Sequence, residues 1–112
     1  MSNDTITFEQ FKRIHLKVGE IVEVTDHPDA DRLYVLKVDI GEDEPRTIVA
    51  GIKQFYPDKN ILLGKQVIIV TNLEPKELRG VKSEGMLLAG CSGNNLSLVS
   101  VDRKLPPGTV IS

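Results

Sequence analysis

Residues 72–86, NLEPKELRGVKSEGM, place three cations among three carboxylates, two glycines and a proline, between two apolar runs. Lysine and arginine side chains in such a segment can contact the phosphates of a nucleic acid, and glycine allows a close backbone approach. The alternative is a solvated connector, because exposed ion pairs contribute only about 0 to 1 kcal/mol each. Both interpretations, a binding surface and a connector, remain open at this point.

The charge of the chain is distributed unevenly. The formal net charge is −2, but residues 1–44 carry 11 acidic and 5 basic side chains, whereas residues 45–83 carry 7 basic and 3 acidic ones. The basic excess includes most of residues 72–86 and is modest. A nucleic-acid partner would therefore be bound with weak to moderate affinity through a few phosphate contacts.

Other chemically active residue types lack the arrangement that catalysis or metal binding requires. In HPDADR, His27 could join Asp29 and Asp31 as metal ligands, but their spacing is not typical of a metal site. We expect a hairpin turn there, with Asp29 bonding its own backbone. Cys91 lacks a matching histidine and aspartate and is expected to be a small buried strand residue. We therefore predict a protein that is not an enzyme and needs no metal or cofactor.

The length and composition of the chain fit one compact domain over residues 1–112, with 40% hydrophobic residues. No apolar run approaches the roughly 18 to 20 residues that span a bilayer, and MSNDTITFEQ does not resemble a signal peptide. One cysteine allows no internal disulfide. We therefore expect a cytoplasmic protein without a membrane partner.

The elements that position these residues are mostly short strands. In TFEQFKRI, Thr7 and Gln10 have capping-box spacing and predict a brief helix packed on the end of a barrel. Glu20 falls on the apolar face of the first strand, which predicts a bulge around Gly19 and Glu20. A helical turn is expected between Pro57 and Gly64. The predicted strands cover residues 16–24, 33–40, 46–51, 66–71 and 85–91, with shorter ones at 96–101 and 109–111.

Short strands at regular spacing, with only small helical pieces, predict an all-β protein. The expected architecture is a five-stranded OB-fold barrel with short helices and additional C-terminal strands. A helical insert between the third and fourth strands fits this fold, which binds oligonucleotides or oligosaccharides on one face. Residues 72–86 would then connect the fourth and fifth strands at that face.

Three blocks of this sequence, VGEIVEVTDHPDADRLYVLKVDIG, RTIVAGI and NLEPKELRGVKSEGMLLAG, resemble the tRNA-binding domain. This domain occurs free-standing, at the C-terminus of many bacterial methionyl-tRNA synthetases, and in eukaryotic synthetase cofactors. The resemblance covers residues 6–112, and the blocks match in order and spacing. It implies an OB fold, usually homodimeric, that recognises the bent shape of tRNA through its backbone.

Backbone recognition of this kind needs cations and hydrogen-bond donors spaced like phosphates and 2′-hydroxyls. Two candidates have structural alternatives: Asn72 could cap a turn at LEPKEL, and Met86 could be core or rim packing. Gly80 is expected to end a short turn at KELR. The candidate tRNA-binding residues are Lys37, Arg46, Lys53, Asn72, Lys76, Arg79, Lys82, Ser83 and Met86.

Aromatic side chains are too few for base stacking to dominate. Of Phe8, Phe11, Tyr34, Phe55 and Tyr56, at least three should pack in the core. Proteins that coat single strands rely on aromatic platforms, so this composition favours a folded RNA.

The resemblance implies that tRNA, a second copy of the chain and a methionyl-tRNA synthetase catalytic subunit are partners. The chain would act free-standing or in trans to increase tRNA affinity. One alternative is a homodimeric secretion chaperone of the CsaA type, which is similar in fold and binds unfolded polypeptide. Another is a protein docking domain of a synthetase complex.

Overall fold

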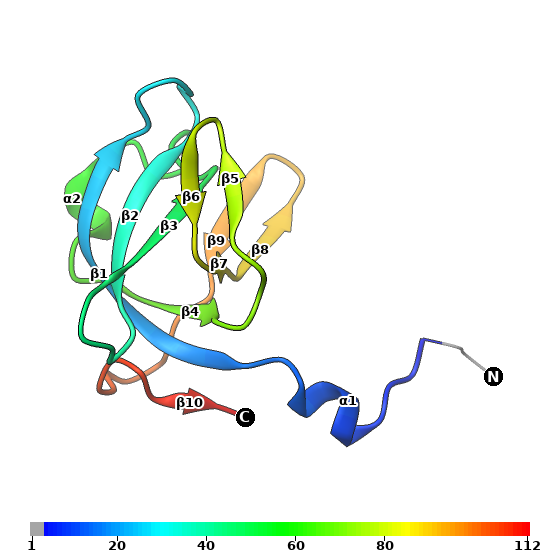
Figure 1. Cartoon of the computed structure of the whole chain (residues 1–112). Coiled ribbons are helices and arrows are strands. Elements are labelled where there is room, and N and C mark those ends of the chain that lie inside the picture. Colours follow the sequence, from blue (N-terminus) through cyan, green and yellow to red (C-terminus); the bar gives the residue numbers. More distant parts are fainter. Residues whose placement is uncertain (1–3) are drawn as a thin grey trace.

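A strongly curved antiparallel sheet forms the centre of the structure, a computed structural model that describes residues 4–112 (Figure 1). Its strand order is β3-β2-β1-β4-β7, and β10 also pairs with β1. β7 contacts β3, so the sheet nearly closes into a five-stranded barrel. The predicted all-β, OB-like fold is confirmed. The strands are β1 (Leu16–Asp26), β2 (Tyr34–Asp39), β3 (Arg46–Ala50), β4 (Gln66–Val70), β7 (Met86–Leu87) and β10 (Val110–Ile111).

The barrel interior is filled by the alternating side chains that the sequence pattern predicts. In β2, Tyr34, Leu36 and Val38 are fully buried, while Val35 and Lys37 between them are only partly buried. Fully burying an aliphatic side chain of this size contributes roughly 1.5 to 3 kcal/mol. The Tyr34 hydroxyl donates a hydrogen bond to the carbonyl oxygen of Tyr56, at 2.7 Å, so its polar end is satisfied inside the core.

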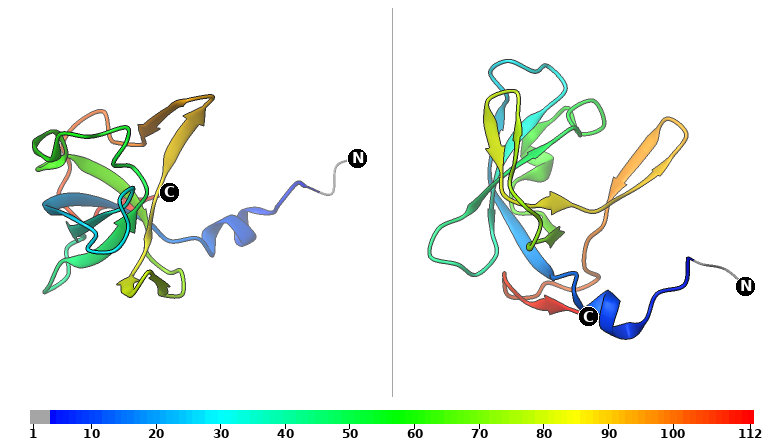
Figure 2. Two further views of the ribbon diagram at one scale, coloured as in Figure 1. Left: turned by 90° about the horizontal axis from the view of Figure 1, so that it is seen from above. Right: turned by 45° about the vertical axis from the view of Figure 1, so that its right-hand side comes forward.

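Two short helices accompany the barrel. α1 (Phe8–Lys12) has the predicted capping box between Thr7 and Gln10, but the prediction that it packs on the barrel end is wrong. None of its residues is buried, and it projects away from the barrel in both views of Figure 2. α2 (Lys59–Leu62) is the predicted insert between β3 and β4, and its Leu62 is completely buried.

The first strand bends at a position different from the one predicted. Its register against β2 shifts between Ile21 and Glu23, not at Gly19 and Glu20. Val22 therefore faces solvent with 46% of its surface exposed. Gly19 has a different role, since a Cβ there would lie 2.5 Å from a methyl group of Val38. The glycine thus allows close packing across the barrel.

The predicted strand at residues 85–91 is wrong in its extent, because the chain leaves the barrel after β7. Leu88 donates its backbone N–H to Ile68 and accepts one from Val99, and the chain then enters a separate hairpin. This hairpin, β8 (Ala89–Ser92) with β9 (Asn95–Leu98), stands away from the barrel (Figure 2). Cys91 lies on it and is exposed, so the expectation of a buried cysteine is also wrong.

Fewer aromatic side chains reach the core than the composition suggested. Tyr34 is buried and Tyr56 packs against the core, but Phe8 and Phe11 are 68% and 38% exposed. Phe55 is only partly buried and lies outside the core cluster. The expectation of at least three core aromatics fails mainly because α1 carries both of its phenylalanines away from the barrel. Within residues 4–112, no helix is long and apolar enough to cross a bilayer.

Gly108→Ala tests how tightly the C-terminal segment packs against the barrel. Gly108 has a φ of +91°, and an added Cβ would lie 2.5 Å from the carbonyl oxygen of Ile40. Gly93 has a φ of +58° and no atom within 4 Å of such a Cβ, so Gly93→Ala is a matched control. Both variants should lose about 1 to 2 kcal/mol through positive φ, and Gly108→Ala about 1 to 3 kcal/mol more through crowding. Urea denaturation measures both; equal losses would contradict the predicted crowding.

Candidate nucleic-acid interface

Residues 72–86 form a hairpin rather than an irregular loop. Its strands are β5 (Lys76–Leu78) and β6 (Val81–Ser83), and they pair with each other but not with the barrel sheet. Arg79 and Gly80 make the two-residue turn, with φ values of +53° and +90°. Two positive φ values are typical of a type I′ hairpin turn, which favours glycine. The predicted short turn at KELR is therefore wrong: Lys76–Leu78 is the first strand of a tight β-hairpin, and Arg79 and Gly80 form its turn.

Bonds to the edge of β3 hold the base of this hairpin. Glu84 donates its backbone N–H to the carbonyl oxygen of Thr47, at 2.8 Å. The Ser83 hydroxyl accepts from the backbone N–H of Val49 at 3.0 Å and donates to the carbonyl oxygen of Gly85 at 3.2 Å. Ser83 is only 4% exposed. Its hydroxyl therefore supports the hairpin from inside, and the predicted RNA contact at this position has little surface to offer.

Arg46 joins three segments of the barrel rather than facing solvent freely. Its Nη1 donates to the carbonyl oxygens of Thr71 and Glu84, at 2.7 and 3.1 Å. Its Nε and Nη2 donate to the two carboxylate oxygens of Glu42, both at 3.0 Å. This bidentate bond raises the pKa of Arg46 and lowers the pKa of Glu42, although partial desolvation opposes both shifts.

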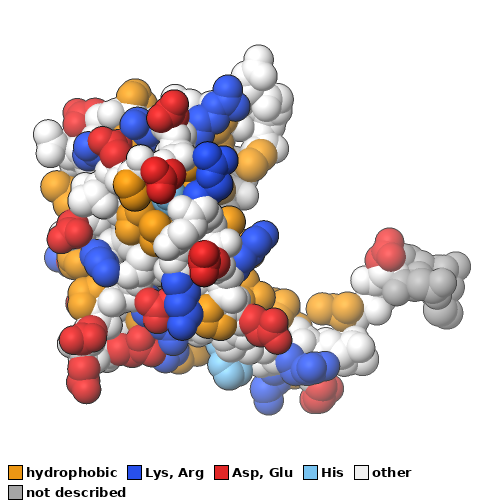
Figure 3. Space-filling model, turned by 45° about the horizontal axis from the view of Figure 1, so that its top comes forward, with side chains coloured by type: hydrophobic (Ala, Val, Ile, Leu, Met, Phe, Trp, Pro, Cys, Tyr) orange, Lys and Arg blue, Asp and Glu red, His pale blue; other side chains and the backbone are white. Residues whose placement is uncertain are grey.

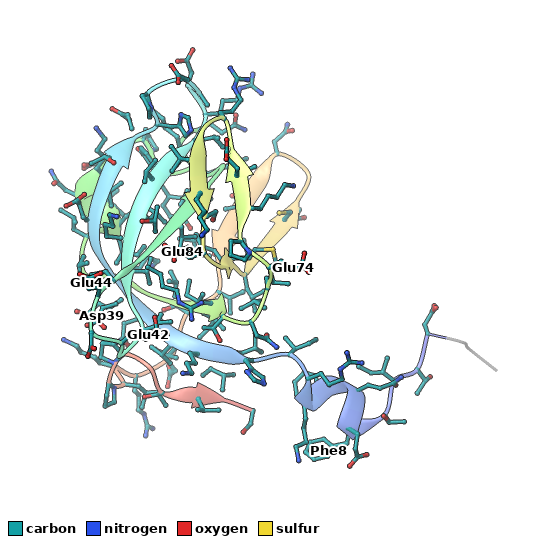
Figure 4. All side chains as sticks on the ribbon, viewed as in Figure 1. Phe8, Asp39, Glu42, Glu44, Glu74 and Glu84 are labelled. Carbon is teal, nitrogen blue, oxygen red and sulfur yellow. The ribbon has the colours of Figure 1, made fainter. Side chains whose placement is uncertain are left out.

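Acidic side chains surround Arg46 in an open hollow next to the hairpin base. Glu42 and Glu44 lie on the turn between β2 and β3, and Glu84 lies where β6 ends (Figure 4). Asp43 completes the acidic part of the lining. An anionic backbone is repelled by such a surface, so the hollow does not suit RNA, and Arg46 is best described as a structural clamp.

Lys53 is also engaged within the protein. Its Nζ lies 3.0 Å from one carboxylate oxygen of Asp26, and the Nζ of Lys59 lies 2.8 Å from the other. Hydrogen bonds from Lys59 and then Lys53 lower the pKa of Asp26, and the bond to Asp26 raises the pKa of Lys53. The three side chains together carry one net positive charge, which weakens the attraction that Lys53 alone would exert on a phosphate.

Asn72 connects the end of β4 to the segment between α1 and β1. Its Oδ1 accepts from the backbone N–H of His15 at 2.9 Å, and its Nδ2 donates to the carbonyl oxygen of Arg13 at 2.6 Å. The cap proposed for LEPKEL is therefore not formed by this amide. Lys37, on the outer face of β2, bonds the Thr47 hydroxyl at 2.6 Å. Its ammonium group has further N–H donors available for a ligand.

Three predicted cations lie on the hairpin and are exposed: Lys76, Arg79 and Lys82. Within residues 4–112, neither lysine has an ion-pair partner, although Lys82 lies across the hairpin from Glu77. Arg79 donates from Nη2 to the carbonyl oxygen of Asp29 at 3.0 Å and keeps its other donors. Among the candidate tRNA-binding cations, those of the hairpin therefore lie outside the ion pairs that engage Arg46 and Lys53.

A shallow groove of about 560 Å³ runs beside the hairpin. Met86 is 48% exposed at its edge, which agrees with rim packing rather than core packing. Basic, acidic and apolar side chains are interspersed on the face drawn in Figure 3, rather than sorted into one basic patch. The lining comprises Val49, Leu73, Glu74, Lys76, Leu78, Ser83, Gly85 and Met86.

The sequence interpretation missed the role of His27, which is 5% exposed. Its Nε2 lies 2.9 Å from the carbonyl oxygen of Leu78 in the hairpin, and its Nδ1 accepts the backbone N–H of Asp29. The local bond at Asp29 is therefore made by its backbone N–H to the imidazole, and not by its side chain as expected. No spacing in the sequence signals this contact, because His27 and Leu78 are 51 residues apart. Among residues 4–112, no group of three His, Cys, Asp or Glu side chains could hold a metal ion.

Comparisons with known proteins agree with this arrangement. Residues 16–110 match the family model of the tRNA-binding domain. Over 106 residues, or 95% of the chain, the sequence is 52% identical to a methionine-tRNA ligase of Pyrococcus horikoshii, of which it spans only 14%.

Two solved structures are similar over nearly their whole length. A MetRS-related protein from Pyrococcus horikoshii has a TM-score of 0.88 and 33% identity, covering 97% of this chain and 99% of that one. The CsaA chaperone protein from Picrophilus torridus has a TM-score of 0.86 and 31% identity, covering 96% and 100%. The family that matches this chain is a non-catalytic binding module. The chain therefore belongs to the tRNA-binding domain family, and is related to the domain found in methionyl-tRNA synthetases.

Proposed function

We propose that this chain is a structure-specific tRNA-binding module that acts free-standing or in trans with a methionyl-tRNA synthetase catalytic subunit, increasing its affinity for tRNA. The observation that carries the proposal is the family match over residues 16–110, which includes the whole hairpin and barrel. The 52% identity to a methionine-tRNA ligase supports the choice of synthetase. The exposed single cysteine supports a reducing, cytoplasmic setting.

The hairpin cations are the proposed phosphate contacts. Lys76, Arg79 and Lys82 project from a segment that is bonded to the barrel at its base and at its tip, so they are held in place before RNA arrives. Lysine and arginine contacts to phosphates position a nucleic acid without reading its sequence. Lys37 on the neighbouring sheet face extends the path. Because acidic side chains adjoin the hairpin base, the RNA path is narrow and depends on shape.

We further propose that α1 and its surroundings form the interface of a homodimer. α1 has five residues, none buried, and an isolated helix much shorter than about 12 residues is unstable in water. Phe11 and Ile14 line two adjoining apolar hollows, one shared with Val110 and the other with Leu73. A second copy supplies the same apolar surface, as a two-fold interface requires. Asn72 fixes the direction in which this helix leaves the barrel.

Binding of unfolded polypeptide is a second candidate function. The similarity to the CsaA chaperone protein, with a TM-score of 0.86, favours it. The groove beside the hairpin also has an apolar lining, from Val49, Leu78 and Met86, that an extended peptide could contact. A tRNA-binding module should prefer tRNA to unfolded polypeptide, and a chaperone should prefer unfolded polypeptide to tRNA. One competition experiment therefore separates the two functions.

Replacing the hairpin cations should weaken tRNA binding without unfolding the domain. Each single substitution removes one phosphate contact: Lys76→Ala, Arg79→Ala or Lys82→Ala. Each should reduce the steepness of the plot of log K against log salt concentration by about 0.7 to 0.9. The measurement is fluorescence anisotropy of labelled tRNA over a salt series. Circular dichroism checks the fold of each variant.

Lys104→Ala provides the matched control, since it removes one exposed lysine from another part of the chain. The adjacent Leu105 bonds Gln66 at the start of β4, whereas the hairpin follows the end of β4. This variant should bind tRNA as the parent does. Unstructured RNA of equal length should compete poorly. If an unfolded polypeptide competes and tRNA does not bind, the chaperone function replaces the proposed one.

Phe11→Glu should convert the dimer into monomers. Burying a carboxylate on each side of the two-fold interface is unfavourable, and loss of a central aromatic contact costs about 2 kcal/mol or more, or roughly thirtyfold in the dimerisation constant. Sedimentation velocity at micromolar concentration gives the oligomeric state. Ile61→Glu is the control, because Ile61 is 59% exposed on α2, outside the proposed interface. A monomeric parent protein would refute the dimer.

A further inference from the structure

The tip of the β5–β6 hairpin lies far from the bonds that hold its base. The hairpin makes no ladder with the barrel sheet, so its position depends on individual contacts. Ser83 and Glu84 supply those contacts at the base. At the tip, two contacts come from the segment between β1 and β2: the imidazole of His27 bonds Leu78, and Arg79 bonds the carbonyl oxygen of Asp29.

The surroundings of His27 determine which nitrogen carries the proton. The backbone N–H of Asp29 can only donate, and it lies 2.9 Å from Nδ1, so Nδ1 must accept. The proton of the neutral imidazole is then on Nε2, which donates to the carbonyl oxygen of Leu78 at 2.9 Å. Both nitrogens are satisfied, and the side chain is 5% exposed. The neutral form of His27 therefore fits this position without an unpaired group.

We propose that His27 is a positioning residue for tRNA binding: its neutral imidazole ties the hairpin tip to the segment between β1 and β2. The tie fixes the height at which Arg79 and the neighbouring Lys82 stand above the barrel. The effect of His27 on tRNA binding rests on the proposed function. The contact between His27 and the hairpin does not, because it forms within the protein alone. Pre-ordering a binding segment increases affinity because less conformational freedom is lost on association.

Protonation of His27 would disrupt the tie. A second hydrogen on Nδ1 would face the N–H of Asp29, so two donors would oppose each other and one bond would be lost. The two hydrogen bonds therefore require the neutral imidazole.

Two substitutions test the two ring nitrogens of His27 separately. His27→Gln carries an amide nitrogen at the reach of Nε2 and can still donate to Leu78. His27→Asn carries an oxygen near Nδ1 that can accept from Asp29 but has no atom that reaches Leu78. Hydrogen exchange of the amides in residues 76–83 reports on the hairpin, and the amides of β1 and β4 report on the barrel in the same experiment.

We expect His27→Asn to speed exchange in residues 76–83 relative to the barrel amides, and to weaken tRNA binding by about threefold to tenfold, the effect of losing one hydrogen bond. His27→Gln should retain most of the protection of the hairpin amides and most of the affinity for tRNA.

The proposal fails if His27→Asn leaves hairpin exchange unchanged relative to the barrel. It also fails if His27→Asn and His27→Gln lose protection equally, since the donor to Leu78 would then be irrelevant. Hairpin exchange without RNA tests the tie even if the parent protein does not bind tRNA, in which case the proposed function alone is refuted. Weakened tRNA binding with an unchanged hairpin would likewise assign His27 a role other than positioning.

Discussion

The free edge of β3 is the constraint on which the position of the β5–β6 hairpin depends. An edge strand presents backbone groups that need partners and that would otherwise pair with another chain. Here residues 83 and 84 supply those partners through the Ser83 hydroxyl and the backbone N–H of Glu84. The chain thus covers the edge without adding a regular strand, and this arrangement sets the hairpin across the barrel face. The position of the cations on it follows from the need to satisfy Thr47 and Val49.

Charge is used in two distinct ways in this protein. Arg46 and Lys53 are held by Glu42 and Asp26, and their shifted pKa values reflect bonds that stabilise the barrel and its loops. The hairpin cations lie outside such pairs. A chain of net charge −2 can therefore still expose three cations on one hairpin, outside the ion pairs that engage Arg46 and Lys53. Composition alone does not distinguish these two uses.

Local patterns in the sequence predicted local structure well. Alternation identified the buried face of β2, and capping-box spacing identified α1. Contacts between distant residues could not be predicted in this way. Asn72 bonds His15 and Arg13, which lie 57 and 59 positions away in the sequence. Nothing in the sequence around Asn72 indicates these partners. The bulge of β1 was misplaced because alternation shows that one residue is extra but not which one. The packing of α1 was misjudged because, among residues 4–112, no element buries its apolar side chains.

The pairing of β10 with β1 brings two remote parts of the chain together. Leu16 lies opposite Ile111, and Lys17 lies opposite Val110, so the last strand lies beside the first, outside the strand path that nearly closes the barrel. A short linker could join residues near these positions, and new termini could then be opened in an exposed turn such as that of β8–β9. A circularly permuted version should keep β5 and β6 in place, since Ser83, Glu84 and Leu78 bond residues 49, 47 and 27, which lie away from β10 and the start of β1.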